Sequence, residues 1–309
     1  MRSQASGRDT FHGASMDWSI ITEVSAHLSS GVPLFGAAIV ILIAARFLFV
    51  LSTPFQVGED LIDAENPAAG VVFAAYLFSV ALALIGTMFG RGQDDTLVAM
   101  AKILVEGTMA IALLRISIWV NDRFILHRFC IVKELRDDKN LGVGFCVAGS
   151  CIASGLILNG AITGYSSNFG YGLRDIAIFW LLGQVVFVVA AYAYHRIARY
   201  DVHELIEYDD NVAVGIGFGA FLVSLGLVVR ASIIGAGLEP LSTELLRALL
   251  LAFVGTLGVL ATSAMATRML TAKLNYEDEV EMHGNVAVSS VTATATLAAA
   301  MLLASIIQR

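Results

Sequence analysis

The 309-residue chain is 57% hydrophobic and only 15% charged, with four prolines and a mean hydropathy of +0.78. These values lie outside the range of ordinary soluble domains and indicate a membrane protein. The formal net charge of −7 comes from acidic connecting loops rather than from a basic face, which argues against a nucleic-acid-binding protein.

The first 30 residues form an N-terminal tail that lacks the continuous apolar region of a signal peptide, so we expect the first span to serve as an uncleaved signal. One apolar helical stripe in the tail predicts a short interfacial helix: Trp18, Ile21, Val24 and Leu28. Met16 is a second candidate for the translation start.

A transmembrane helix needs about 20 largely apolar residues to cross the hydrocarbon layer. Eight segments meet this requirement: roughly 32–53, 67–89, 97–120, 141–163, 175–196, 212–236, 245–268 and 286–307. We therefore predict an all-α, polytopic membrane protein with eight transmembrane helices, arranged as four parallel two-helix repeats.

The repeats are visible as acidic stretches that end in Asn before every second apolar segment. The acids and the Asn residues are Asp60 and Asn66, Glu134 and Asn140, Glu204 and Asn211, and Glu279 and Asn285. The Asn residues lie 74, 71 and 74 positions apart (66 to 140, 140 to 211, 211 to 285), which indicates duplication of a two-unit half. We expect an N-terminal tail over 1–30, a first four-helix half over 31–164 and a second half over 165–309.

Each unit contains two spans, so all four units insert in the same orientation. Small residues follow each Asn and allow helix backbones to approach closely: Gly142, Gly144, Gly149, Gly215, Gly217, Gly219 and Ala287. We expect the units to pack as a ring or as a pair of four-helix halves.

The repeated motif, acid-aliphatic-x-acid followed by Asn-x-[Ala/Gly]-[Val/Ala]-[Gly/Ser] between apolar helices, resembles the bacterial inner-membrane family known as domain of unknown function 350. The resemblance covers nearly everything after residue 30, as two joined members of two units each. The third unit has one extra residue between Glu204 and Asn211, and the fourth has Met282 in place of the second acid. The resemblance implies an inner-membrane location and no particular activity.

Asn is among the best N-capping residues, so we expect the four motif Asn residues to cap the helices that follow them. If the capped ends gather around one axis, their dipoles could instead receive an anion. The acids are favoured by the same dipoles, or could bind a divalent cation through their oxygens. Four histidines lie in or beside these loops without zinc-motif spacing, so no metal site is predicted: His127, His195, His203 and His283.

Lys and Arg near the span ends set the orientation, because cytoplasmic loops carry the excess. Nine lie in the loops inside the repeats and seven on the opposite side, which places the acidic loops in the cytoplasm and both termini outside. The nine are Arg123, Arg128, Lys133, Arg136, Lys139, Arg196, Arg199, Arg268 and Lys273, and the seven are Arg2, Arg8, Arg91, Lys102, Arg174, Arg247 and Arg309.

Charged groups within a span are costly and usually contact a partner or water. Lys102 and Arg123 lie 21 residues apart (123 − 102), about 31 Å of helix, and mark the two faces of one bilayer. Arg115 is the deepest charge between them. We predict an asymmetric polar cluster of Glu106, Arg115 and Arg230, which is either functional or a means of fixing helix pairing; Lys102 is an alternative partner for Glu106.

The sequence contains no nucleophile motif, phosphate-binding loop or pair of catalytic acids, so we expect no enzyme activity and no cofactor. The leading hypothesis is a membrane protein that provides a polar path for ions or small solutes. The alternative is a membrane-stress or scaffold protein whose acidic loops dock a soluble cytoplasmic protein. Candidate partners are the lipid bilayer, further copies of the chain and such a protein.

Overall fold

The computed structural model describes residues 18–88, 95–128, 130–164, 168–197, 202–207, 209–235, 237, 239–270 and 278–308. Within these ranges the chain is helical and contains no strand. Eight helices are long and apolar enough to cross a membrane: α1 (Trp18–Ser52), α2 (Pro67–Met88), α3 (Thr96–Phe124), α5 (Leu141–Ile162), α6 (Phe169–Ile197), α8 (Val212–Ile233), α9 (Leu241–Leu270) and α10 (Val286–Ile307). The prediction of an all-α protein with eight spans is confirmed.

The predicted interfacial helix is the first part of α1 and not a separate element. Helix α1 begins at Trp18 and continues through Pro33 into the first span, with Ile21, Val24 and Leu28 exposed. The expected boundary between tail and first half therefore falls inside a helix. Residues 1–17, which include the candidate start Met16, lie outside the described residues.

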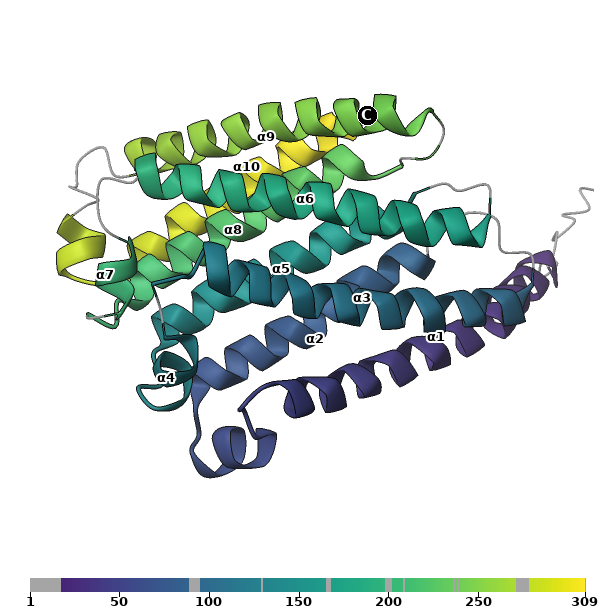
Figure 1. Cartoon of the computed structure of the whole chain (residues 1–309), viewed down its shortest axis with the longest axis horizontal. Helices are drawn as coiled ribbons and strands as arrows, with labels where there is room; N and C mark the ends of the chain where they lie inside the picture. The colour runs from purple at the N-terminus through teal and green to yellow at the C-terminus, as the bar shows by residue number, and fades with distance from the viewer. Residues whose placement is uncertain are drawn as a thin grey trace, which may run out of the picture.

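The long helices form two layers (Figure 1). The second helix of each unit belongs to an inner row in the order α2, α5, α8, α10, and the first helices form an outer row of α1, α3, α6 and α9. Helices α3, α6 and α9 each contact the inner helix of their own unit and that of the unit before. Helix α5 is consequently buried along almost its whole length.

The inner row is open, with α2 and α10 at its two ends (Figure 1). This open row is not the predicted ring, and the predicted pair of four-helix halves is joined through α5 and α8. Helices α5 and α8 belong to different halves, yet they are in extensive contact, as are α2 and α5 within the first half. The four units thus continue one another without a break at the middle of the chain.

Small residues bring the inner helices together, as the sequence predicted. A Cβ atom added to Gly155 would lie 2.7 Å from Cα of Ser79, and one added to Gly226 would lie 2.6 Å from Cα of Ala153. In the last unit Ser289 takes the place of a glycine, and its hydroxyl donates a hydrogen bond to the Ala213 carbonyl. Close backbone contact supplies the attraction between helices that lipid does not.

In each unit one short helix lies between the two spans. In chain order these helices are η1 (Val57–Asp63), α4 (Ile131–Arg136), α7 (Val202–Glu207) and η2 (Asp278–Met282). All four lie at one end of the bundle, whereas α1 begins and α10 ends at the other (Figure 1). This arrangement is that of parallel repeats, with both ends of the described chain opposite the acidic loops.

Candidate functional site

The four acidic loops share one backbone geometry. The residue before each motif Asn has a positive φ angle: 47° at Glu65, 54° at Lys139, 49° at Asp210 and 57° at Gly284. The backbone N–H of each Asn then donates to the carbonyl six residues earlier, at Asp60, Glu134, Leu205 and Glu279, over 2.8 to 3.1 Å. A left-handed residue is uncommon outside glycine, so its recurrence at one position marks four equivalent turns.

Each motif Asn caps the helix that follows it, as predicted. The side-chain oxygen accepts a hydrogen bond from the backbone N–H three residues later, at 3.1 Å in Asn66, 3.0 Å in Asn140, 3.1 Å in Asn211 and 3.2 Å in Asn285. The capped ends are spread along the row and do not surround one axis (Figure 1). The alternative of a shared anion site at a common axis does not fit this arrangement.

The amide group of each Asn has a second function that the sequence did not reveal. Nδ2 of Asn66 donates to the Leu135 carbonyl at 2.7 Å, that of Asn140 to the Ile206 carbonyl at 2.7 Å, and that of Asn211 to the Val280 carbonyl at 2.8 Å. Every acceptor lies five residues before the Asn of the next unit. One side chain therefore caps its own helix and holds the following loop.

The acids six residues before Asn are anchored within or between units. Asp60 accepts a hydrogen bond from the Gln56 N–H at 2.7 Å and lies 3.3 Å from Nε of Arg136, in the next loop. Glu134 and Glu279 accept from Nδ2 of the Asn in their own units, at 3.1 and 2.8 Å. These acids stabilise the loops.

Glu204 does not share this position. In the third loop Leu205 lies six residues before Asn211, so the extra residue moves Glu204 one place outside the equivalent site. The described residues also contain no group of three or more His, Cys, Asp or Glu side chains that could hold a metal ion. The described parts of these loops therefore offer no repeated set of ligands for a divalent cation.

The three charges predicted to form an intramembrane cluster have different partners. Nη2 of Arg115 donates to the carbonyl of Ser52, the last residue of α1, at 2.7 Å. Glu106 is buried beside Thr87 and interacts electrostatically with Lys102, its predicted alternative partner. Arg230 contacts neither group, as described next, so the structure does not bring the three together.

Arg230 links three inner helices. Its Nε donates to Oδ1 of Asn159, and Nδ2 of Asn159 donates to the Leu82 carbonyl at 2.7 Å. Both side chains lie 19 residues after their motif Asn (159 − 140 and 230 − 211), so equivalent positions of adjacent units are joined directly. This chain of hydrogen bonds fixes helix pairing.

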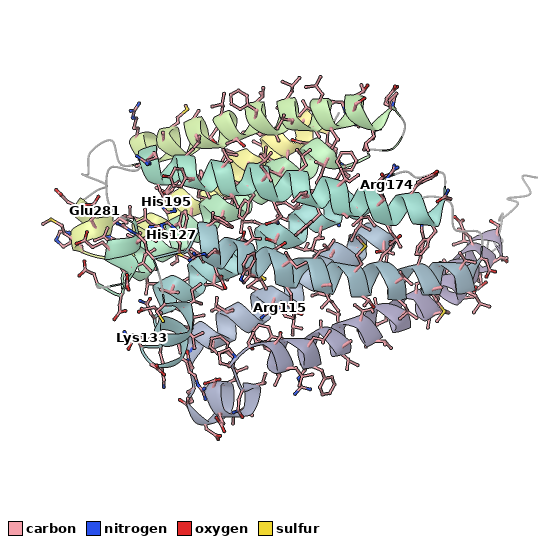
Figure 2. All side chains as sticks on the ribbon, viewed as in Figure 1. Arg115, His127, Lys133, Arg174, His195 and Glu281 are labelled. Carbon is pink, nitrogen blue, oxygen red and sulfur yellow. The ribbon has the colours of Figure 1, made fainter. Side chains whose placement is uncertain are left out.

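Arg115 belongs to a different polar group that sequence reasoning did not identify. Its guanidinium bonds the last residue of α1, so it lies between α3 and the loop end of that span, whereas Lys133 and Arg174 lie at opposite ends of the bundle (Figure 2). Asp122 is seven residues further along α3 and interacts electrostatically with Arg115. The charge of Arg115 also acts on Tyr76 of α2 and on Cys151 of α5, so its electrostatic influence reaches two inner helices.

A second set of polar groups adjoins it on α3, α5 and α6. Nδ2 of Asn121 and Nε2 of Gln184 both donate to the hydroxyl of Ser154, at 3.0 and 3.4 Å. One α-turn before Asn121, the Ser117 hydroxyl accepts a 2.9 Å bond from Nε1 of Trp180. Asn121, Ser154 and Gln184 are all buried.

Four oxygens of these two sets are buried and have no hydrogen-bond partner among the described residues: Oη of Tyr76, Oδ1 of Asn121, Oδ1 of Asp122 and Oε1 of Gln184. We call these four residues together with Arg115 and Ser154 the oxygen cluster. Buried polar atoms are normally paired, and each exception needs an explanation such as an ion or water.

Three histidines lie at the loop end of the oxygen cluster. The centroid of the His203 ring lies 4.5 Å from the ring centroid of His195 and 5.5 Å from that of His127. Nε2 of His203 lies 3.1 Å from the Ile125 carbonyl, just after the end of α3. His127 is exposed, His203 is buried and His195 is half-buried, and Figure 2 shows His127 and His195 at this end.

The fold and the loops define a multi-pass membrane protein in which two-helix units are joined through their capping Asn residues. The sequence model of the family described as Domain of Unknown Function (DUF350) matches residues 24–162 and 168–307. The chain belongs to this family and contains two tandem copies of the domain, as the motif predicted. Comparisons with curated proteins and with solved structures gave no match.

Proposed function

We propose that the chain binds small monovalent cations at the oxygen cluster and conducts them across the bacterial inner membrane. The observation that carries the proposal is the set of unpartnered oxygens on Tyr76, Asn121, Asp122 and Gln184. In Asn121, Asp122 and Gln184 the unpartnered atom is itself an acceptor, a carboxylate or amide oxygen.

The energetic argument rests on the surroundings of these oxygens. Inside the helix bundle no solvent compensates a buried unpaired polar atom, which costs several kcal/mol. A cation or a chain of water molecules between α2, α3, α5 and α6 relieves that cost for several oxygens together. Because Arg115 offsets the charge of Asp122, the cluster suits a monovalent cation better than a divalent one.

The proposed path begins at the acidic loops, which we place in the cytoplasm. Exposed carboxylates on these loops raise the local concentration of cations at its mouth. The three histidines follow, then the oxygen cluster. Beyond Ser117 the inward positions of α3 are apolar until Glu106, 11 residues away (117 − 106) or about 16 Å. Glu106 is the polar group in the half of the path that is farther from the acidic loops. The apolar segment of α3 between Glu106 and Ser117 is the gate.

Cation flux into liposomes that contain the purified chain tests the proposal. Asp122→Asn keeps the size of the side chain and removes its charge, so we expect it to abolish flux while the protein stays folded. Asp137→Asn, in an exposed loop position outside the cluster, is the matched control; it removes only one of several exposed loop carboxylates and should retain flux. Separate gradients of protons, Na⁺ and K⁺ identify the ion. Absence of flux from well-folded native protein, or equal flux in Asp122→Asn, contradicts the proposal.

A specific observation also supports the scaffold alternative. While the acids six residues before Asn are anchored, others in the same loops are exposed: Asp63, Glu65, Asp137, Asp138, Asp209 and Asp210. They form a row of negative charge at the loop end of the bundle that could dock a basic cytoplasmic protein. For that function, neutralising the exposed acids should abolish capture of the partner, and Asp122→Asn should leave it unchanged.

A further inference from the structure

Each inner helix uses two different faces to contact its neighbours. The forward face, which contacts the next unit, contains the residues 2 and 13 positions after the motif Asn. The backward face, which contacts the previous unit, contains the residues 4 and 15 positions after it. The contacts of Gly155 with Ser79 and of Gly226 with Ala153 are two examples of this forward-to-backward pairing.

The forward face is covered wherever a next unit exists. Its residues are buried in the first three units: Ala68 and Ser79, Gly142 and Ala153, and Ala213 and Ser224. On α10 the equivalent residues, Ala287 and Ala298, are exposed. Leu302 is 68% exposed, although the side chains 17 positions after Asn in the other units are fully buried: Ala83, Ile157 and Val228.

The backward face of α2 is open in the same way. Its residues Gly70 and Ala81 are partly exposed, whereas all four equivalents on α5 and α8 are buried: Gly144, Gly155, Gly215 and Gly226. A Cβ atom added to Gly70 would meet only a side-chain atom of Leu61, at 3.6 Å. The two ends of the row therefore present complementary halves of an interface that forms three times within the chain.

The last motif Asn also lacks the link that the others make. Nδ2 of Asn66, Asn140 and Asn211 donates to a carbonyl of the next loop, whereas within the described residues Nδ2 of Asn285 donates to Glu279 of its own loop. An amide group has two hydrogens, and Asn140 uses both, for Glu134 and for Ile206. Asn285 has the same capacity for an acceptor in a further unit.

We infer that copies of this chain associate head to tail, with the forward face of α10 against the backward face of α2 in a second copy. The Asn285 amide then donates to the Leu61 carbonyl of that copy, since Leu61 lies five residues before Asn66, as Leu135, Ile206 and Val280 do before the next Asn. Helix α1 of the second copy takes the position against α10 that α3, α6 and α9 take against the inner helix of the preceding unit.

This contact joins two different surfaces, so it generates a ring if its rotation closes and a longer row if it does not. It is independent of the proposed cation path. Helix α10 contributes no oxygen to the cluster, and the one residue that α2 contributes, Tyr76, is fully buried and lies away from the open face of α2. Failure of either proposal leaves the other standing.

Disulfide cross-linking in lipid nanodiscs tests the register. Gly142 and Gly215 are in direct backbone contact within one chain, and they lie 2 and 4 positions after their motif Asn residues. Ala287 and Gly70 occupy the same two positions, so Ala287→Cys in one copy should meet Gly70→Cys in another. Two singly substituted chains, each also carrying Cys130→Ser to remove the exposed native thiol, are mixed and oxidised with copper–phenanthroline. We expect a mixed dimer. Ala298→Cys with Gly70→Cys is the control, 11 residues (298 − 287) or about 16 Å out of register.

Several outcomes overturn the inference: no cross-link, equal cross-linking of the control pair, or a dimer from Ala287→Cys alone, which would indicate a two-fold contact. The mass of the assembly in nanodiscs gives a second readout. The native chain should be oligomeric, and Ala298→Trp should convert it to a folded monomer, because the substituted residue is exposed within one copy. A native chain that is monomeric, with lipid on both end faces, contradicts the inference.

Discussion

Replacement of Asn140 by Ala should destabilise the protein more than replacement of Asn285, the motif Asn of the last unit. Asn140 is 2% exposed and makes three side-chain hydrogen bonds: it accepts from the Val143 N–H and donates to the Ile206 carbonyl and to Glu134. Only the first of these is an ordinary helix cap. The other two join the second unit to the third and hold the buried acid.

The magnitude follows from these contacts. Loss of an Asn cap costs about 1 kcal/mol. The Ile206 carbonyl is then left without this donor, which costs about 1–3 kcal/mol, and the Glu134 carboxyl loses one hydrogen bond, worth about 1 kcal/mol. We expect Asn140→Ala to lower the free energy of unfolding by about 3–5 kcal/mol. In the detergent-solubilised monomer Asn285→Ala, which removes a cap and a half-buried contact to Glu279, should lower it by about 1–2 kcal/mol.

Reversible unfolding of the monomer in mixed micelles, followed by circular dichroism, measures both variants. The expected difference of about 2 kcal/mol corresponds to about a 30-fold difference in the unfolding equilibrium constant. Equal destabilisation by Asn140→Ala and Asn285→Ala would refute the reasoning, because it would show that the links between units contribute nothing beyond the caps.

Three further predictions test other parts of the structure. Gly155→Ala should lower the free energy of unfolding by about 1–3 kcal/mol, since its Cβ would meet the Ser79 backbone, whereas Gly36→Ala, with nothing within 4 Å, should not destabilise. Gly284→Ala should cost about 1 kcal/mol, because φ is +57° there; unchanged stability would contradict the assigned turn. Burial raises the pKa of Glu134, so the folded state binds more protons and stability should fall as the pH rises from about 4.5 through the raised pKa. Glu134→Gln should flatten that dependence in a pH series of unfolding curves.

Local patterns were sufficient to predict the spans and their caps. Runs of apolar residues identified all eight spans, and Asn at a fixed place before a span predicted the caps, since both depend on residues close together in the sequence. The row order was not predictable. Small residues show that helices approach closely, but they do not show whether the last helix returns to the first.

The site was predicted only in part. Arg115 was predicted to be a deep charge, and in the structure its guanidinium donates to the Ser52 carbonyl. Asp122 was overlooked because it lies next to Arg123, which resembles the boundary of the span. The spacing of seven residues between Arg115 and Asp122 places them on one helix face and was the available signal. The amide links between loops depend on residues 66 to 70 positions apart, for which a single sequence gives no sign.

Infrared difference spectroscopy of the native chain in nanodiscs, on addition of a monovalent cation, tests the central claim most directly. If the oxygen cluster binds the cation, the spectrum contains a carboxylate band that is absent in Asp122→Asn and present in Asp137→Asn. If no cation changes the spectrum of the native chain, or if all three proteins give the same difference spectrum, the oxygen cluster is not a cation site.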